Sequence, residues 1–314
     1  MNLDEREQFR ADALAGLAAR PRAIPCKYLY DERGSALFEG ICETGDYYVT
    51  RADLALHEAH LDEIEAAIGP DAHIIEFGSG AGIKIRKILG ASDHLRAYTP
   101  IEISGEALAQ SVAALEEQFP GMEIRPLQAD YTQDIPAEKF RLDPPARRRV
   151  IYFPGSTISN FTHDEAHAFI TRMARISGPG GGALIGVDLT KSPERLERAY
   201  DDAEGVTAAF NRNLLARLED DLGAALEADA FEHRAVYDEE RERIEMHLVA
   251  ARDTAIELDG RRFDFAAGDF IHTENSHKYS LDGFRALVEG TGFRPVDVWT
   301  DPDGLFSMHY LETD

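Results

Sequence analysis

The sequence contains few cysteines and no long apolar segment. Cys26 and Cys42 are the only cysteines among 314 residues, too few for a disulfide framework or a thiolate zinc site. We therefore expect a reduced, cytoplasmic protein. No apolar run approaches the roughly 18 residues that cross a bilayer. The N-terminus is charged and lacks the apolar core of a signal peptide, so we expect no membrane segment.

Basic residues are also scarce relative to acidic ones. Lys and Arg together number 33 against 58 Asp and Glu, which gives a net charge of −25. Such a charge repels phosphate backbones and anionic lipids, so we expect neither nucleic acid nor membrane as a partner. Hydrophobic residues at 44% and charged residues at 29% are ordinary for a globular protein. We expect a monomer that binds a small-molecule substrate.

Strands alternate with helices in the first part of the chain, which predicts βαβ units and a parallel sheet. The expected strands cover 72–77, 97–103, 122–128, 148–153 and 183–189. The expected helices cover 3–20, 53–68, 82–90, 105–118 and 163–177. The pattern then changes to helices over 193–230, antiparallel strands over 231–274 with an Asp259-Gly260 hairpin turn, a helix at 281–290, and strands at 293–299 and 305–310.

This pattern predicts an α/β, Rossmann-like sheet domain interrupted by an insertion. We expect the sheet domain to comprise 53–189 plus 279–314. Residues 1–52 plus 190–278 would form a second, α+β, substrate-binding lobe. Ligands of such sheets bind beyond the carboxyl ends of the strands, so we expect a cleft between the two parts.

A glycine-rich segment, EFGSGAG at 76–82, follows the first expected strand of the sheet. Gly78, Gly80 and Gly82 suit a backbone that must adopt positive φ or approach a ligand closely. A dinucleotide fingerprint would be G-x-G-x-x-G, and Ile83 stands where its third glycine belongs. The pattern E-x-G-x-G-x-G is instead typical of the first motif of S-adenosylmethionine (AdoMet) methyltransferases. A purely structural turn is the alternative.

Charged residues at the ends of the following elements suit a nucleoside ligand. Glu102 ends the second strand, where a carboxylate can accept both ribose hydroxyls. Asp130 could accept an adenine amino group while Tyr131 covers the ring, and Lys84 lies within reach of the ligand carboxylate. The alternatives are a solvated carboxylate at Glu102, a helix cap at Asp130 and a solvated Lys84.

The loop after the fourth strand, 155–160, has residues suited to the methyl acceptor. Asn160 both donates and accepts hydrogen bonds, as an amino acid's amine and carboxylate require; capping the next helix is its alternative role. His272 and His277 flank Glu274, but this spacing matches no metal motif, so we expect no metal.

Several segments resemble the L-histidine Nα-methyltransferase family of ergothioneine biosynthesis. The resemblance covers nearly the whole chain and lies in YLYDERGSALF at 28–38, DYYVTR at 46–51, FPGSTISN at 153–160 and AYDDAEGVTAAFNRN at 199–213. It implies a class I AdoMet methyltransferase fold with a second substrate-binding lobe. The implied reaction is trimethylation of the histidine α-amino group, which yields hercynine.

The resemblance also implies a role for each matched position. Gly78, Lys84, Glu102, Asp130 and Tyr131 fall on the family's AdoMet contacts, although Glu102 replaces the aspartate of better-known members. Asn160, in the loop that begins at Gly155, and Tyr200 are implied to hold the amino-acid backbone of the substrate. Tyr47 and Glu274, with Ser276, match residues that bind the imidazole. Tyr30 matches an aromatic residue beside the methyl-accepting nitrogen, and Met246 one that packs on the ring. Asn275, in the same strand, is also expected to contact substrate, although it and His277 differ from the family's usual residues.

Two other interpretations remain open from the sequence. One is a methyltransferase of the same fold that acts on another amino acid, such as tryptophan or tyrosine. The other is a non-catalytic AdoMet-binding protein with a partner on its acidic surface. In the main hypothesis Asn160 and Tyr30 are the catalytic residues, and no dedicated strong base is expected because the sulfonium is already a good methyl donor.

Overall fold

A computed structural model describes residues 3–80, 82–92 and 94–314. The chain divides into two compact units. Unit 1 comprises Met1–Tyr48 and Lys191–His277, and unit 2 comprises Val49–Thr190 and Lys278–Asp314. Within the described ranges, every helix is too short or too polar to cross a bilayer.

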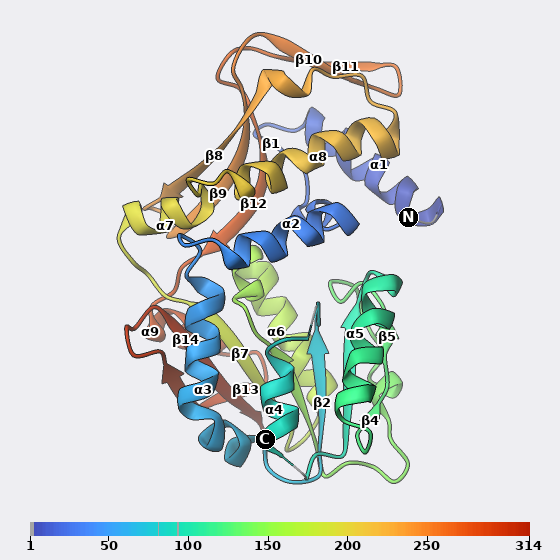
Figure 1. Ribbon diagram of the computed structural model, residues 1–314, viewed down its shortest axis with the longest axis vertical. Helices are drawn as coiled ribbons and strands as arrows, with labels where there is room; N and C mark the ends of the chain where they lie inside the picture. Colours follow the sequence, from blue (N-terminus) through green and yellow to red (C-terminus); the bar gives the residue numbers. More distant parts are fainter. Residues whose placement is uncertain (1–2, 81, 93) are drawn as a thin grey trace. The chain divides into compact units, whose positions relative to one another are not determined.

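Unit 2 is built on a mostly parallel sheet (Figure 1). Its strands lie in the order β13 (Phe293–Thr300), β14 (Phe306–Thr313), β7 (Gly182–Asp188), β6 (Arg148–Phe153), β2 (Ala72–Phe77), β3 (Ala97–Glu102) and β4 (Glu123–Ile124), and β5 (Leu127–Gln128) also pairs with β3. Strands β2, β3, β6 and β7 run parallel, whereas β14 is antiparallel to both its neighbours. The predicted Rossmann-like fold is confirmed.

The strand order reverses at β2, which has β3 on one side and β6 on the other. From β2 the chain proceeds outward through β3 and β4, then returns to start again at β6. The crevice at such a switch point, beyond the carboxyl ends of the strands, is where open α/β sheets bind ligands. The glycine-rich segment follows β2, so the topology places it at this position.

Two local predictions in unit 2 were wrong. The expected strand at 122–128 is two short strands, β4 and β5, because Pro126 lies between them and cannot donate a ladder hydrogen bond. The helix expected at 82–90 is α4 (Ile85–Ala91). It starts later because Gly82 has φ of 66°, which is not helical.

Helices cover both faces of the unit 2 sheet. On one face α6 (His163–Ser177) and α9 (Leu281–Val288) pack against side chains such as Ile151 and Phe153 in a continuous apolar core. Tyr152 alternates to the other face, where its hydroxyl bonds His57 of α3 (Val49–Ile68) at 2.7 Å. Helix α5 (Gly105–Gln118) contacts β3, and a short helical turn, η2, spans Ala137–Phe140.

Unit 1 contains a four-stranded sheet in the order β1 (Arg22–Ala23), β12 (Phe270–His277), β9 (Arg243–Ala250) and β8 (Phe231–Asp238). Its helices are α1 (Leu3–Ala18), α2 (Glu32–Glu43), α7 (Pro193–Tyr200) and α8 (Val206–Leu222), with short turns η1 (Cys26–Leu29) and η4 (Ala228–Ala230). A separate hairpin pairs β10 (Thr254–Leu258) with β11 (Arg261–Phe265). Asp259 and Gly260 both have positive φ at its tip, which confirms the predicted hairpin turn.

The two faces of the unit 1 sheet differ. Helix α8 packs on one face, where Asn211 bonds the hydroxyl of Thr273 at 2.6 Å. The opposite face, which we call the open face, carries the exposed residues Glu232, Arg234 and Val236 of β8. Because paired residues of antiparallel strands point to the same side, the register assigns each side chain of β9 and β12 to one of these two faces.

Candidate functional site

The glycine bend, which we define as residues 78–80 and 82, follows β2. Gly78, Gly80 and Gly82 have φ of 70°, 48° and 66°, so the predicted positive φ is confirmed at all three. The amides of Gly78 and Ser79 both donate to the carbonyl of Ile101, at 2.9 and 3.2 Å. These bonds fix the bend against the end of β3.

Glu102 lies directly against the glycine bend. Its Oε2 accepts a hydrogen bond from the Gly80 amide at 3.2 Å, and its Oε1 accepts from the Ile103 amide at 2.8 Å. The carboxylate is therefore held by backbone donors at the carboxyl end of β3. Ile103, the next residue, is 38% exposed although apolar, which places an unprotected apolar surface beside the carboxylate.

Asp130 and Tyr131 lie after β5. One oxygen of Asp130, Oδ1, accepts from both the amide and the hydroxyl of Thr132, at 2.9 and 2.6 Å, so the side chain stabilises its own turn. The Tyr131 ring stacks on Phe77, with centroids 6.1 Å apart. A Cβ on Gly78 would lie 3.2 Å from this ring, so the glycine permits the ring to lie close to the bend.

Lys84 is bound to a partner that sequence reasoning missed. Its Nζ lies 2.7 Å from Oδ2 of Asp53 in α3, and the same oxygen accepts from the Gly155 amide at 2.9 Å. Burial alone would raise the pKa of Asp53, but the Lys84 ammonium and His57 outweigh it and hold that pKa well below its usual range. One ionised carboxylate thus connects the glycine bend to the loop after β6.

The sequence contains a pattern that could have predicted the ion pair of Asp53. Val49, Ala52 and Leu56 are buried in α3 at helical spacing, and Asp53 falls within the same stripe, where it is fully buried. A carboxylate on the apolar face of a helix is costly unless it is paired. Its position therefore implies a cationic partner, here the partly exposed Lys84.

A second buried acid precedes the glycine bend. Glu76 is almost fully buried in β2 and accepts a hydrogen bond from the Tyr98 hydroxyl. Burial raises the pKa of its carboxyl to about 8, despite this bond and the Lys84 charge. Glu76 is thus mainly protonated at neutral pH, whereas Asp53 is ionised.

Asn160 ends the short helical turn η3 (Thr157–Asn160) after β6. The turn is entered through Gly155 and Ser156, both at positive φ. Ser156 accepts from the Asp188 amide at 2.8 Å and bonds the hydroxyl of Ser159, which fixes this conformation. Helix α6 is capped by Thr162 with a capping box, so Asn160 is not its cap.

The other residues expected to bind the amino acid, apart from Gly155 and Asn160, lie in unit 1. The Tyr200 hydroxyl bonds Ser276 at 2.7 Å, and the Tyr47 ring meets that of Tyr200 edge-on at 5.9 Å. The pKa of Tyr47 is well above its usual value because the phenol is buried and lies near Tyr200, Tyr30 and Glu274. Tyr47 thus remains a neutral hydrogen-bonding group.

Further candidates in unit 1 are Glu274, Met246 and Tyr30. Glu274 pairs with Met246, both nearly buried, on the face toward α8. Tyr30 packs edge-on against Phe38 and Phe210, at 5.6 and 5.2 Å.

Asn275 requires a correction to the predicted set. It pairs with Glu245, so its side chain belongs to the open face, opposite to Glu274 and Ser276. Alternation along the strand separates it from the other expected substrate contacts.

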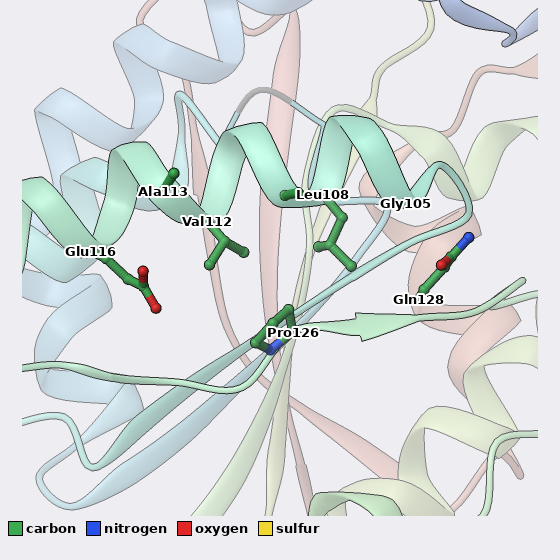
Figure 2. Close-up of a pocket in the computed structure, with 8 residues that line it drawn as sticks. Gly105, Leu108, Val112, Ala113, Glu116, Pro126 and Gln128 are labelled. Carbon is green, nitrogen blue, oxygen red and sulfur yellow. The ribbon is translucent and has the colours of Figure 1, made fainter.

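A shallow pocket in unit 2 lies outside the candidate site. It has a volume of about 320 Å³ between α5 and the edge of the sheet. Leu108 and Val112 face Pro126 across it, with Gly105 and Gln128 at one end (Figure 2). It contains none of the predicted cofactor residues and results from the interruption of the edge strand at Pro126.

The glycine bend, the strand-end carboxylate and the strand order together define a class I AdoMet-dependent methyltransferase. Residues 9–313 match the model of the family described as "Histidine-specific methyltransferase, SAM-dependent". The chain belongs to this family, so it is a methyltransferase that uses AdoMet.

Relatives of known name are similar to the chain over most of its length. The histidine N-alpha-methyltransferase of Mycolicibacterium smegmatis is 39% identical over 96% of this chain and 94% of that protein. The histidine N-alpha-methyltransferase of Mycobacterium tuberculosis is 36% identical over 96% of this chain and 93% of that protein. Ergothioneine biosynthesis protein 1 of Neurospora crassa is 30% identical over 89% of this chain, which spans 32% of that protein.

Proposed function

We propose that this enzyme transfers three methyl groups from AdoMet to the α-amino nitrogen of L-histidine, giving hercynine in ergothioneine biosynthesis. Membership of the histidine-specific family supports the substrate class. The observation that carries the proposal is Glu274, a nearly buried carboxylate beside Tyr47 in unit 1. A carboxylate that bonds an imidazole N–H loses this charge-assisted bond when an apolar amino acid takes the place of histidine, which favours histidine.

In this proposal unit 2 is the AdoMet-binding domain. Gly78, Gly80 and Gly82 carry no Cβ atom that would exclude a ligand, and Glu102 would accept the ribose hydroxyls. Asp130 and Tyr131 would hold and cover the adenine. Lys84, whose ammonium retains donors beyond its bond to Asp53, would bind the carboxylate. The bound sulfonium supplies an activated methyl group with a neutral leaving group.

Unit 1 is proposed to bind the histidine. Glu274, Tyr47 and Ser276 would bond the imidazole, and Met246 would pack against its ring. Tyr200, whose hydroxyl bonds Ser276, would fix the amino-acid end. Asn160, from unit 2, would also bond the amine. Tyr30 would stabilise the increasingly methylated ammonium through its ring face.

The reaction needs alignment more than acid–base catalysis. The neutral amine nitrogen attacks the methyl carbon, the C–S bond breaks as the N–C bond forms, and S-adenosylhomocysteine leaves. Holding the reacting atoms in line at about 3–3.5 Å supplies much of the rate enhancement. Asn160 would orient the nitrogen lone pair, and water would take the proton released in each of the first two transfers.

A product assay tests the proposal directly. Purified protein is incubated with AdoMet and each of the twenty amino acids, and products are weighed by mass spectrometry. We expect histidine to gain one, two and three methyl groups. Methylation of tryptophan or tyrosine but not histidine would overturn the substrate assignment. AdoMet binding without turnover on any amino acid would overturn the catalytic assignment.

We also propose that the enzyme is a cytoplasmic monomer without nucleic-acid or membrane partners. The low cysteine content and the net charge of −25 support this proposal. Light scattering on the eluting protein would reveal a dimer, and fractionation of cells would reveal a membrane-bound form.

A further inference from the structure

The open face of the unit 1 sheet carries a cluster that the methyl-transfer chemistry does not use. Glu245 and His247 project from β9, and His272 is paired with His247 across the ladder from β12. One donor atom from each of the three residues lies within 4.8 Å of the other two. The cluster lies on the face opposite Glu274 and Met246, so it is separate from the proposed substrate contacts.

A β-bulge creates this cluster. The register between β12 and β9 shifts between His272 and Glu274, where Thr273 is the extra residue. Because of the shift, His272 points to the open face although Glu274, two positions later, points toward α8. Sequence spacing grouped His272 with Glu274 and His277, whereas the fold groups it with His247 and Glu245.

A hydrogen bond determines which nitrogen of the His272 ring is available to bind an ion. Its Nε2 lies 3.0 Å from the carbonyl oxygen of Glu274, and a carbonyl can only accept, so Nε2 carries the hydrogen. In the neutral ring Nδ1 then holds the lone pair. An imidazole whose second nitrogen donates to a backbone carbonyl is the usual arrangement of a metal-ligating histidine.

The other two side chains are also held in place. The His247 ring stacks on Phe270 with centroids 4.1 Å apart, and its Nε2 lies 2.9 Å from Oε2 of Glu245. Arg243 binds the other oxygen of Glu245. Because these contacts already restrict the side chains of His247 and Glu245, binding an ion would cost little conformational entropy, which favours a high affinity for the ion.

The protonation states also suit a cation. Burial is the main cause that lowers the pKa of both His247 and His272, so both rings are neutral at neutral pH. The pKa of Glu245 is lowered by Arg243 and His247 against the opposing effect of burial, so the carboxylate is ionised. Two neutral imidazoles and one carboxylate match the ligand set of catalytic zinc sites, which keep a further position for water.

We propose that Glu245, His247 and His272 form a binding site for a divalent transition-metal ion of the zinc type. The ion would replace the hydrogen bond between His247 and Glu245, and the ring of His247 would change tautomer, so that Nδ1 carries the hydrogen and Nε2 holds the lone pair that binds the ion. Arg243 competes with the ion for Glu245.

The site is tested by metal binding to the full-length protein without a polyhistidine tag and without histidine in the buffer. Zn²⁺ affinity is measured by competition with a chromophoric chelator, and Co²⁺ is added separately to record visible absorption. We expect one high-affinity Zn²⁺ per chain and Co²⁺ bands of a four- or five-coordinate site. Substitutions H247Q and H272Q should each weaken Zn²⁺ binding at least tenfold, and R243Q should strengthen it.

The matched control is H60Q. His60 lies 3.3 Å from Glu63, and among the described residues this pair belongs to no cluster of three potential metal ligands, so this substitution should leave Zn²⁺ affinity unchanged. Thermal melts without metal confirm that each variant is folded. Equal Zn²⁺ affinity in wild type, H247Q and H272Q would overturn the proposal, as would an equal loss in H60Q.

Discussion

Lys84, which is partly exposed, forms an ion pair with the buried Asp53, with Nζ and Oδ2 2.7 Å apart. Asp53 also accepts from the Gly155 amide, so one carboxylate orders two loops that both follow parallel strands. The pair links the stability of unit 2 to the shape of its ligand-binding edge.

We predict that D53N destabilises the protein and weakens cofactor binding together. Removing one partner of a buried pair leaves the other uncompensated, and we expect a loss of about 3 kcal/mol in unfolding free energy. S-adenosylhomocysteine should bind about tenfold more weakly by calorimetry, since each 1.4 kcal/mol corresponds to a factor of ten. A double-mutant cycle with K84M is the control: the two losses should not add, because both substitutions break the same pair.

Glu76 predicts an unusual pH dependence of stability. Its pKa is about 8 in the folded protein and near 4.3 in an unfolded chain. Between these values the folded state binds the proton that the unfolded state has lost, so stability falls as pH rises. The neutral isostere E76Q should escape this loss. We expect its stability relative to wild type to increase by about 4 kcal/mol between pH 5 and pH 9, measured by urea denaturation. A pH-independent difference would show that Glu76 is ionised in the folded state.

Substitution of Gly78 separates backbone strain from steric contact. Both G78A and G80A place a Cβ on a residue with positive φ, which costs about 1–2 kcal/mol. Only at Gly78 would the Cβ meet another side chain, the Tyr131 ring at 3.2 Å; at Gly80 nothing lies within 4 Å. G78A should therefore weaken S-adenosylhomocysteine binding more than G80A, by a factor of about five if the contact costs about 1 kcal/mol. Equal losses would mean that strain alone matters.

Glu274 should determine histidine affinity without affecting the cofactor. E274Q replaces a charge-assisted bond with a neutral one, a loss of about 2 kcal/mol. We expect the KM for histidine to rise about thirtyfold while the Kd for S-adenosylhomocysteine stays within a factor of two. The control is E232Q, at an exposed position of the open face. A parallel loss of cofactor affinity in E274Q would indicate a general structural defect.

Much of unit 2 could be predicted because its signals are local. The strands at 72–77 and 148–153 and the helices at 105–118 and 163–177 have the predicted bounds. Their apolar periodicity and caps lie within the segments themselves. The start of α4 and the break at Pro126 were missed because positive φ at Gly82 and the missing proline donor act at single residues.

The sequence by itself determined the fold class, the glycine bend and the family, because each depends on residue type and order along the chain. Only the tertiary structure decided which side chains meet. Asp53 pairs with Lys84 across two helices, Asn275 lies on the face opposite Glu274, and His272 joins His247 through a one-residue bulge. These groupings depend on strand register and helix packing, in which a shift of one residue exchanges the two faces of a strand.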